Sequence, residues 1–268
     1  MPTNYMKTIC KLYIEKTSQV KKKKIGLALG GGAALGAAHI GVLHALEEKG
    51  VSITHIAGTS IGSLIAALYA FGKTVDEIKE IALDLRWMKV TDISISKFAL
   101  LSNEKLGKVV EEHIGDKNIE DADIPLGIVA TNISTGEKVL LDKGPVARAV
   151  MASSCIPGLF EPVEMDDVML VDGGIVENVP IQTVLDLGAD YIVGVDLHAK
   201  FANEKPKNIL DVLVSSFHIT MMASAKLQNE VADLMIKPDL SDFNLTNTGQ
   251  AVDLIRQGYK EAKKALKG

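Results

Sequence analysis

Short apolar runs alternate with longer segments of helical period along most of the chain. An apolar run at 25–29 precedes a helical pattern over 37–49, and a second run at 52–57 precedes another over 61–71. Short runs bounded by glycine or proline are typical of buried strands, whereas apolar positions three and four residues apart are typical of helices. The pattern predicts strands and helices in alternation.

The rest of the chain continues this alternation. It predicts strands at 125–131, 138–141, 168–172, 189–197 and 234–236, and helices at 74–85, 104–114, 146–152, 180–187, 208–231 and 249–266. Strands that alternate with helices favour a parallel sheet covered on both faces. We therefore expect an α/β fold with three α/β/α layers and a mainly parallel central sheet.

Length and composition fit one large domain. The 268 residues are 47% hydrophobic, which is enough for a single core over 25–268, with 1–24 as an N-terminal appendage. A net charge of −5 and an aromatic content of 4% argue against a nucleic-acid surface. Cys10 and Cys155 are too few and too far apart for a disulfide framework or a zinc site, so we expect a reducing compartment and no metal or cofactor. The sequence does not indicate an oligomeric state.

The lysine run at 21–24 precedes an uncharged segment, 25–46, that is apolar enough to resemble a membrane span. Glycines, among them Gly30, Gly31, Gly32, Gly36 and Gly41, interrupt it together with His39 and His44, and its period changes from strand to helix, so a span is not expected. We expect a cytoplasmic protein. Its lysines could add attraction for anionic lipids at the inner membrane face.

The segment Gly58-Thr59-Ser60-Ile61-Gly62 lies where the second apolar run ends and a helical segment begins. In a strand-turn-helix context, Gly-x-Ser-x-Gly forms a tight elbow that exposes the serine, and its glycines leave room where a Cβ would collide. The N–H of Ile61, at the helix N-terminus, would face a developing oxyanion. The alternative is an ordinary helix start, but the context favours Ser60 as a nucleophile.

A glycine-rich segment, Gly30 to Gly36, joins the first strand to the first helix. A dinucleotide fingerprint would need glycine at Leu35, and a Walker A loop would need lysine at Ala37. Backbone N–H groups of a loop at a helix N-terminus can surround negative charge. Because the elbow follows closely, we interpret the segment as a second part of an oxyanion hole, with a plain turn as the alternative.

Asp172 ends the strand predicted at 168–172 and precedes Gly173 and Gly174. An aspartate beside glycines is often a turn former. Near Ser60 and partly shielded from water, it would instead be a general base with a raised proton affinity. The mixed segment 86–101 is our candidate for a lid or acyl-chain wall.

Several segments, in this order, resemble the patatin-like phospholipase family, and specifically its compact bacterial members. The resemblance covers 25–197 and rests on the segments 30–43, 58–62, 152–158, 172–174 and 178–180. It implies a three-layer α/β fold and a serine/aspartate pair that hydrolyses fatty-acyl esters or phospholipids through an acyl-enzyme. By position, it implies Ser60 as nucleophile, Asp172 as base, an oxyanion hole of Gly31, Gly32 and Ile61, and supporting glycines at Gly30, Gly36, Gly58, Gly62, Gly173 and Gly174.

One position departs from this resemblance, and two alternatives remain open. Leu35 stands where the family usually has arginine or lysine, which favours a non-catalytic protein that binds acyl ligands or a partner. His198 follows the strand predicted at 189–197, so Ser60, Asp172 and His198 could also form a triad in α/β-hydrolase order. His39 is expected to pack and to support the glycine loop.

Overall fold

The computed structural model describes residues 23–84, 92–93, 101–198, 206, 209–228, 230–245 and 247–267. The expected appendage at 1–24 and the candidate lid at 86–101 lie almost wholly outside these residues. Within them, no helix is both long and apolar enough to cross a bilayer.

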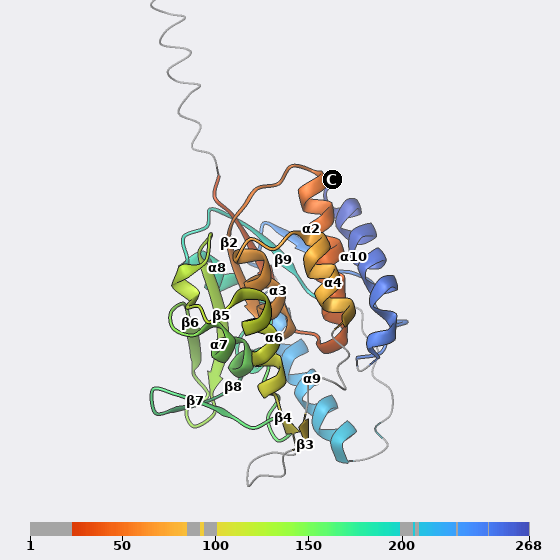
Figure 1. Ribbon diagram of the computed structural model, residues 1–268. Coiled ribbons are helices and arrows are strands. Elements are labelled where there is room, and N and C mark those ends of the chain that lie inside the picture. The colour runs from red at the N-terminus through yellow and green to blue at the C-terminus, as the bar shows by residue number, and fades with distance from the viewer. Residues whose placement is uncertain are drawn as a thin grey trace, which may run out of the picture.

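A central sheet of eight strands organises the described part of the chain (Figure 1). The strand order is β10-β9-β1-β2-β5-β8-β7, with β6 beside β5, and β3 and β4 form a separate pair. The strands are β1 (Ile25–Leu29), β2 (Ile53–Thr59), β3 (Asp92–Ile93), β4 (Leu101–Ser102), β5 (Leu126–Asn132), β6 (Lys138–Leu141), β7 (Val163–Met165), β8 (Val168–Asp172), β9 (Tyr191–Val195) and β10 (Leu234–Ile236).

Helices follow most of the strands. They are α2 (Ala37–Glu48), α3 (Ile61–Ala70), α4 (Val75–Asp84), α6 (Glu104–Ile114), α7 (Val146–Ser153), α8 (Ile181–Asp186), α9 (Ile209–Gln228) and α10 (Ala251–Ala265), with 3₁₀ turns η1 (Ala33–Gly36), η2 (Ile119–Asp121), η3 (Gly173–Ile175) and η4 (Thr248–Gln250).

The two faces of the sheet bury different layers of helices. Leu27 and Leu29 of β1 belong to the main apolar core, which also contains residues of α2, α3 and α10. Ala28, between them, faces a second cluster that includes Val184 of α8 and Ala225 of α9. Successive side chains of a strand point to opposite faces, so the sheet lies between two helical layers. Figure 1 shows α2 and α10 together on one side of it and α8 on the other. The expected three-layer α/β/α fold is confirmed.

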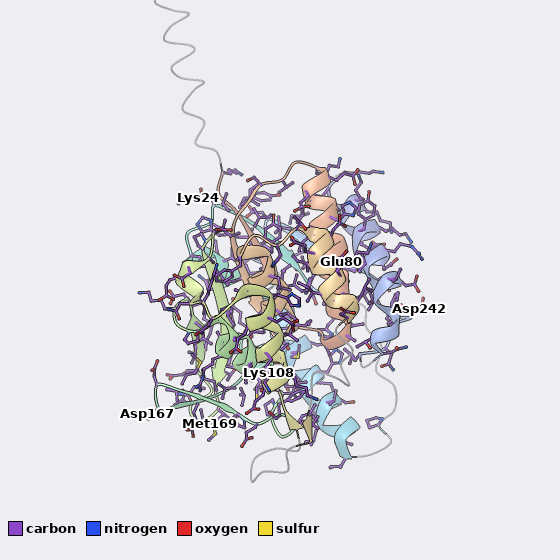
Figure 2. All side chains as sticks on the ribbon, viewed as in Figure 1. Lys24, Glu80, Lys108, Asp167, Met169 and Asp242 are labelled. Carbon is purple, nitrogen blue, oxygen red and sulfur yellow. The ribbon has the colours of Figure 1, made fainter. Side chains whose placement is uncertain are left out.

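Strand direction is mainly parallel, as expected. β10, β9, β1, β2 and β5 run parallel to one another. β6 and β8 run antiparallel to β5, and β7 runs antiparallel to β8. Lys24, just before β1, and Asp167, in the turn between β7 and β8, lie at opposite ends of the molecule (Figure 2). β1 runs away from Lys24, so the carboxyl ends of the parallel strands face the end at which α9 is labelled in Figure 1.

Candidate active site

Ser60 lies in the turn between β2 and α3. Its φ of 53° and ψ of −128° fall in a region that non-glycine residues rarely adopt, and such backbone strain is concentrated at functional sites. The turn is held on both sides: the Ser60 N–H donates to Ser153 Oγ at 2.9 Å, and the Ser63 hydroxyl donates to the Ser60 carbonyl at 2.6 Å. The strained serine is therefore fixed by its neighbours.

Gly58 and Gly62 allow this turn to pack tightly. A Cβ on Gly58 would lie 2.3 Å from the Gly62 carbonyl oxygen, and a Cβ on Gly62 would lie 2.2 Å from the Leu29 carbonyl oxygen. Both contacts are with backbone, which cannot move aside as a flexible side chain can. The elbow geometry thus requires glycine at both positions, as the motif predicts.

Asp172 comes next to Ser60 through the register of the sheet. Thr59 at the end of β2 pairs with Val129, and the following residue of β5, Ala130, pairs with Asp172 at the end of β8. β8 is antiparallel to β5, so it begins beyond the carboxyl end of β5 and runs back toward the elbow. Its last residue, Asp172, therefore lies at the level of Ser60.

The Asp172 carboxyl group is completely buried. Its Oδ1 accepts the Gly174 N–H at 2.8 Å, and its Oδ2 has no hydrogen bond of standard geometry to any described residue. Burial raises the pKa of Asp172 to about 7, although the Gly174 N–H and the neighbouring Ser60 hydroxyl both lower it. A carboxylate of this proton affinity beside a serine has the properties of a general base.

The glycine loop is anchored to its surroundings at several points. The Gly30 N–H donates to the Val195 carbonyl at 3.1 Å, and His39 Nε2 donates to the Gly30 carbonyl at 2.8 Å. The expected support of the loop by His39 is confirmed. Burial lowers the pKa of His39 to about 4, so this histidine is neutral near pH 7.

The three expected oxyanion donors differ in their present partners. The Gly31 N–H already donates to Asn178, to its carbonyl and its Oδ1, both at 3.2 Å. The N–H groups of Gly32 and Ile61 have no acceptor among the described residues. An added Cβ on Gly31 would lie 3.2 Å from the Ser60 Cβ, so the loop runs directly past the serine.

Comparison with known proteins identifies the family of this fold and site. The family model for patatin-like phospholipases matches residues 27–185, which include the glycine loop, Ser60 and Asp172. The chain belongs to the patatin-like phospholipase family. An uncharacterized NTE family protein of Mycobacterium bovis is 37% identical over 182 residues, which are 67% of this chain and 50% of that protein. Lysophospholipase NTE1 of Mycosarcoma maydis is 36% identical over 65% of this chain and 10% of its own length.

Solved structures share the fold of this patatin-like chain. VipD from Legionella pneumophila superimposes with a TM-score of 0.53 at 18% identity, covering 92% of this chain and 67% of VipD. The type III effector ExoU superimposes with a TM-score of 0.53 at 15% identity, covering 91% of this chain and 53% of ExoU. The chain therefore spans about half the length of the mycobacterial relative and of ExoU.

A small apolar cavity opens at Ser60 in the patatin-like domain. Its volume is about 140 Å³. Gly32, Ser60 and Ser154 line one side, and α9 covers it with Val214, Phe217 and Met221. The remaining lining residues are Ala33, Ile156, Leu159, Phe160, His198, His218 and Leu245. Apolar side chains thus surround the space into which a reacting group would extend.

A pair of buried histidines lies on the wall of this cavity. Nε2 of His218, from α9, lies 2.6 Å from Nδ1 of His198. In a serine triad, the aspartate would hold that Nδ1 atom; here His218 lies against it instead. Burial lowers the pKa of both histidines, so both are neutral near pH 7. His218 had no motif around it in the sequence, and only the folding of α9 over the cavity reveals it.

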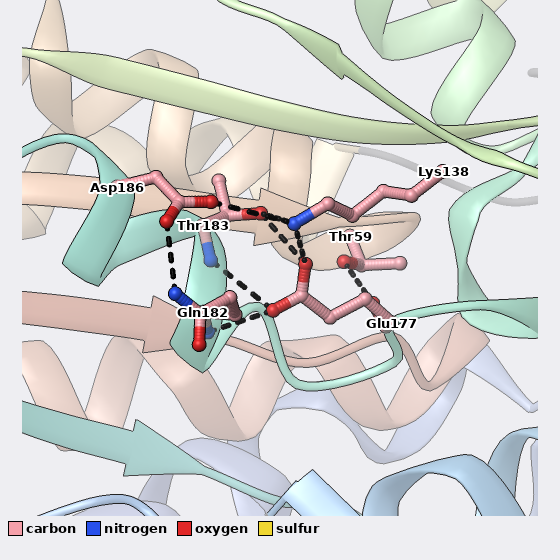
Figure 3. Close-up of polar contacts among 6 residues, drawn as sticks. All are labelled: Thr59, Lys138, Glu177, Gln182, Thr183 and Asp186. Atoms are coloured by element: carbon pink, nitrogen blue, oxygen red, sulfur yellow. Dashed lines mark hydrogen bonds and ion pairs between the residues drawn. The ribbon is translucent and has the colours of Figure 1, made fainter.

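A polar network behind the elbow fixes the loop that follows Asp172 (Figure 3). Buried Glu177 accepts the N–H groups of Gln182 and Thr183 at the start of α8, at 2.8 and 3.2 Å. Its side chain also pairs with Lys138 at 3.1 Å, and its carbonyl accepts the Thr59 hydroxyl at 2.8 Å. Thr59 directly precedes Ser60, so this network connects the elbow to α8. Sequence reasoning did not identify Glu177; an acid just before a helix start was the available signal.

Leu35 is completely buried in the main core. The leucine therefore packs as an ordinary core residue at the position where the resemblance would place a cation. Gly36, beside it, is required by packing, since its Cβ would lie 2.3 Å from Ile61 Cγ1.

Proposed function

We propose that the protein is a serine acyl hydrolase that cleaves fatty-acyl esters of lipids, with Ser60 as nucleophile and Asp172 as general base. The observation that carries this proposal is the pairing of a strained elbow serine with a fully buried carboxyl group whose pKa is raised to about 7. A carboxylate with an ordinary pKa near 4 would be a weak base for a serine hydroxyl, and the raised value reduces that difficulty.

The reaction would proceed in two halves. Asp172 takes the Ser60 proton while Oγ attacks the ester carbonyl carbon, and the carbonyl π electrons move onto the oxygen. The tetrahedral intermediate collapses, the alcohol leaves with the proton from Asp172, and an acyl-enzyme remains. In the second half, Asp172 deprotonates a water molecule that attacks the acyl-enzyme, and collapse returns the proton to Ser60 and releases the fatty acid.

The oxyanion would be held by backbone N–H groups. Gly32 and Ile61 are the two expected donors with N–H groups free of partners among the described residues. Gly31 would contribute only if the oxyanion displaced the Asn178 acceptors from its N–H. Preorganised donors of this kind supply a large share of the rate in acyl transfer.

The substrate class follows from the cavity and from the relatives. The lining of the cavity at Ser60 is almost entirely apolar, which suits an acyl chain. Matched relatives carry the names lysophospholipase NTE1 and, in Drosophila melanogaster, neuropathy target esterase sws. We therefore propose a fatty-acyl ester or phospholipid as substrate. A cytoplasmic location with peripheral contact at the inner membrane face is still our expectation from the sequence, where the lysine run at 21–24 precedes the domain.

Hydrolysis of a short and a long chromogenic acyl ester tests the proposal directly. Ser60→Ala and Asp172→Asn should each lower turnover by at least about 10³-fold while remaining folded. Activity of the parent should rise with pH through about 7, as Asp172 loses its proton. Turnover in either variant that matched the parent would refute the dyad.

His198→Ala separates the dyad from a triad. His198 and Ser60 line the same cavity, and this observation supports a triad as the alternative mechanism. A dyad enzyme should keep turnover within about tenfold, whereas removal of a triad histidine costs orders of magnitude. A parent protein with no turnover on any ester would favour the alternative of a non-catalytic acyl-binding protein.

A further inference from the structure

The outer face of α9 is unusually apolar for a surface helix. Nine large apolar side chains are exposed in the described part of the chain, and five of them lie on α9. The sequence has no charged residue from 212 to 223, whereas the solvent side of a surface helix is normally charged or polar. The five residues are Ile209, Val212, Leu213, Ile219 and Met222.

The exposed hydroxyl groups on this face already have partners within the helix. The Ser216 hydroxyl donates to the Val212 carbonyl at 2.8 Å, and the Thr220 hydroxyl donates to the Ser216 carbonyl at 3.1 Å. A hydroxyl bonded to the carbonyl four residues earlier can leave water without losing its hydrogen bond. The Ser216 and Thr220 hydroxyl groups can therefore enter an apolar medium with their hydrogen bonds intact.

The inner face of the same helix covers the cavity at Ser60. Val214, Phe217 and Met221 line that cavity, whose volume of about 140 Å³ is well below the ~300–1,000 Å³ typical of ligand sites. A lipid tail would need more room than this arrangement provides. α9 thus separates the cavity from whatever contacts the outer face.

The charge of the sequence around α9 indicates which kind of apolar partner would contact its outer face. Residues 199–228 contain four lysines and two carboxylates, although the whole chain has a net charge of −5. Three of those lysines, Lys200, Lys205 and Lys207, lie within the nine residues that precede the helix in the sequence. Basic residues next to an apolar helical face are typical of helices that lie in the interface of anionic membranes.

We propose that α9 docks its outer face into an anionic lipid surface, so that the helix covering the cavity at Ser60 lies against the lipids. This proposal rests on the proposed function for its purpose, since docking would bring a lipid ester to Ser60. The docking itself depends only on the outer face of α9 and can be measured without turnover.

Vesicle binding tests the docking on a Ser60→Ala background, in which turnover is not required. Ile219→Gln/Met222→Gln changes two exposed side chains outside the cavity lining, and Val252→Gln, at an exposed position of α10, is the matched control. On vesicles of phosphatidylcholine with phosphatidylglycerol, the α9 double variant should bind about fivefold more weakly or worse, and the control should bind like its parent. Binding of the parent should also weaken on pure phosphatidylcholine.

Activity provides the second readout, with Ser60 intact. The α9 double variant should keep its turnover of a soluble short-chain ester and lose turnover of a vesicle-borne lipid. Equal vesicle binding by parent and double variant would overturn the proposal. So would sedimentation in which the parent self-associates and the double variant is monomeric, because the face would then bind a second copy. Vesicle binding that depends on α9 in a protein without turnover would refute the proposed function and leave the docking intact.

Discussion

At the residue scale, the burial that raises the pKa of Asp172 also makes the stability of the fold depend on pH. Its pKa is raised from 3.8 to about 7, with burial as the largest cause. In the unfolded chain the carboxyl group ionises near its ordinary pKa, so between about pH 4 and 7 the folded state binds more protons than the unfolded state. This group therefore stabilises the fold below that window, and its contribution is lost as the pH rises through about 7.

Asp172→Asn should remove this dependence. The amide cannot ionise, and its oxygen can still accept the Gly174 N–H. We expect the variant to be more stable than the parent at pH 8 and to differ little from it at pH 4. Urea unfolding at the two pH values measures the difference. A variant that is less stable than the parent at pH 8 would contradict the raised pKa.

Leu35 leads to a second prediction at this scale. Because it is fully buried in the main core, Leu35→Arg would place a charge among apolar side chains. Restoring the cation usual in the family should therefore destabilise the domain by about 3 kcal/mol or more, without raising esterase activity. Leu35→Met is the volume-matched control and should cost less than about 1.5 kcal/mol. Stable, more active Leu35→Arg protein would show that the loop can reorganise to expose this position.

At the scale of elements, the start of α8 depends on one buried side chain. Glu177 accepts two N–H groups of its first turn and pairs with Lys138, whose side chain is 30% exposed. Glu177→Ala would leave those donors without partners, so we expect a loss of about 3 kcal/mol. Glu177→Gln keeps an acceptor oxygen and should lose less. Glu112→Ala, on the exposed surface of α6, is the control, and thermal unfolding is the measurement.

Elements also show how far the sequence could predict this site. The elbow at Ser60 was predictable because its glycines, strand and helix are consecutive in the chain. The resemblance implied Asp172 as the base, but the apolar pattern could not place it beside Ser60, because a strand has the same pattern whether it runs parallel or antiparallel to its neighbour. Only the antiparallel pairing of β8 with β5 places the carboxyl group at the elbow. His218 lies twenty residues from His198, on a helix without a motif, so its contact depends on tertiary packing alone.

At the scale of the whole molecule, the C-terminal part is integrated with the segment that defines the family. The family match ends at residue 185, yet β9 lies between β1 and β10 in the sheet. α10 lies along α2, the helix that follows the glycine loop (Figure 1). This arrangement predicts that the domain unfolds as one cooperative unit.

Gly258 allows α10 to approach α2 closely. A Cβ there would lie 2.0 Å from the Ala38 carbonyl oxygen, which belongs to the backbone of α2. Gly258→Ala should force the two helices apart and lower the stability of the entire domain by about 2 kcal/mol, because both helices contribute to the main core. For a domain of this size that corresponds to a Tm lower by roughly 4–8 °C.

Calorimetry distinguishes this whole-domain effect from a local one. Gly258→Ala should unfold in a single transition at the lower temperature, with its esterase activity lost in the same transition. Gly249→Ala is the control, because its added Cβ would contact only a side-chain oxygen, that of Asn247, at 3.1 Å. Two separate transitions in the Gly258→Ala variant would mean that α10 unfolds on its own. The glycine loop would then keep its shape without α10, and the C-terminal helix would be a dispensable addition to the fold.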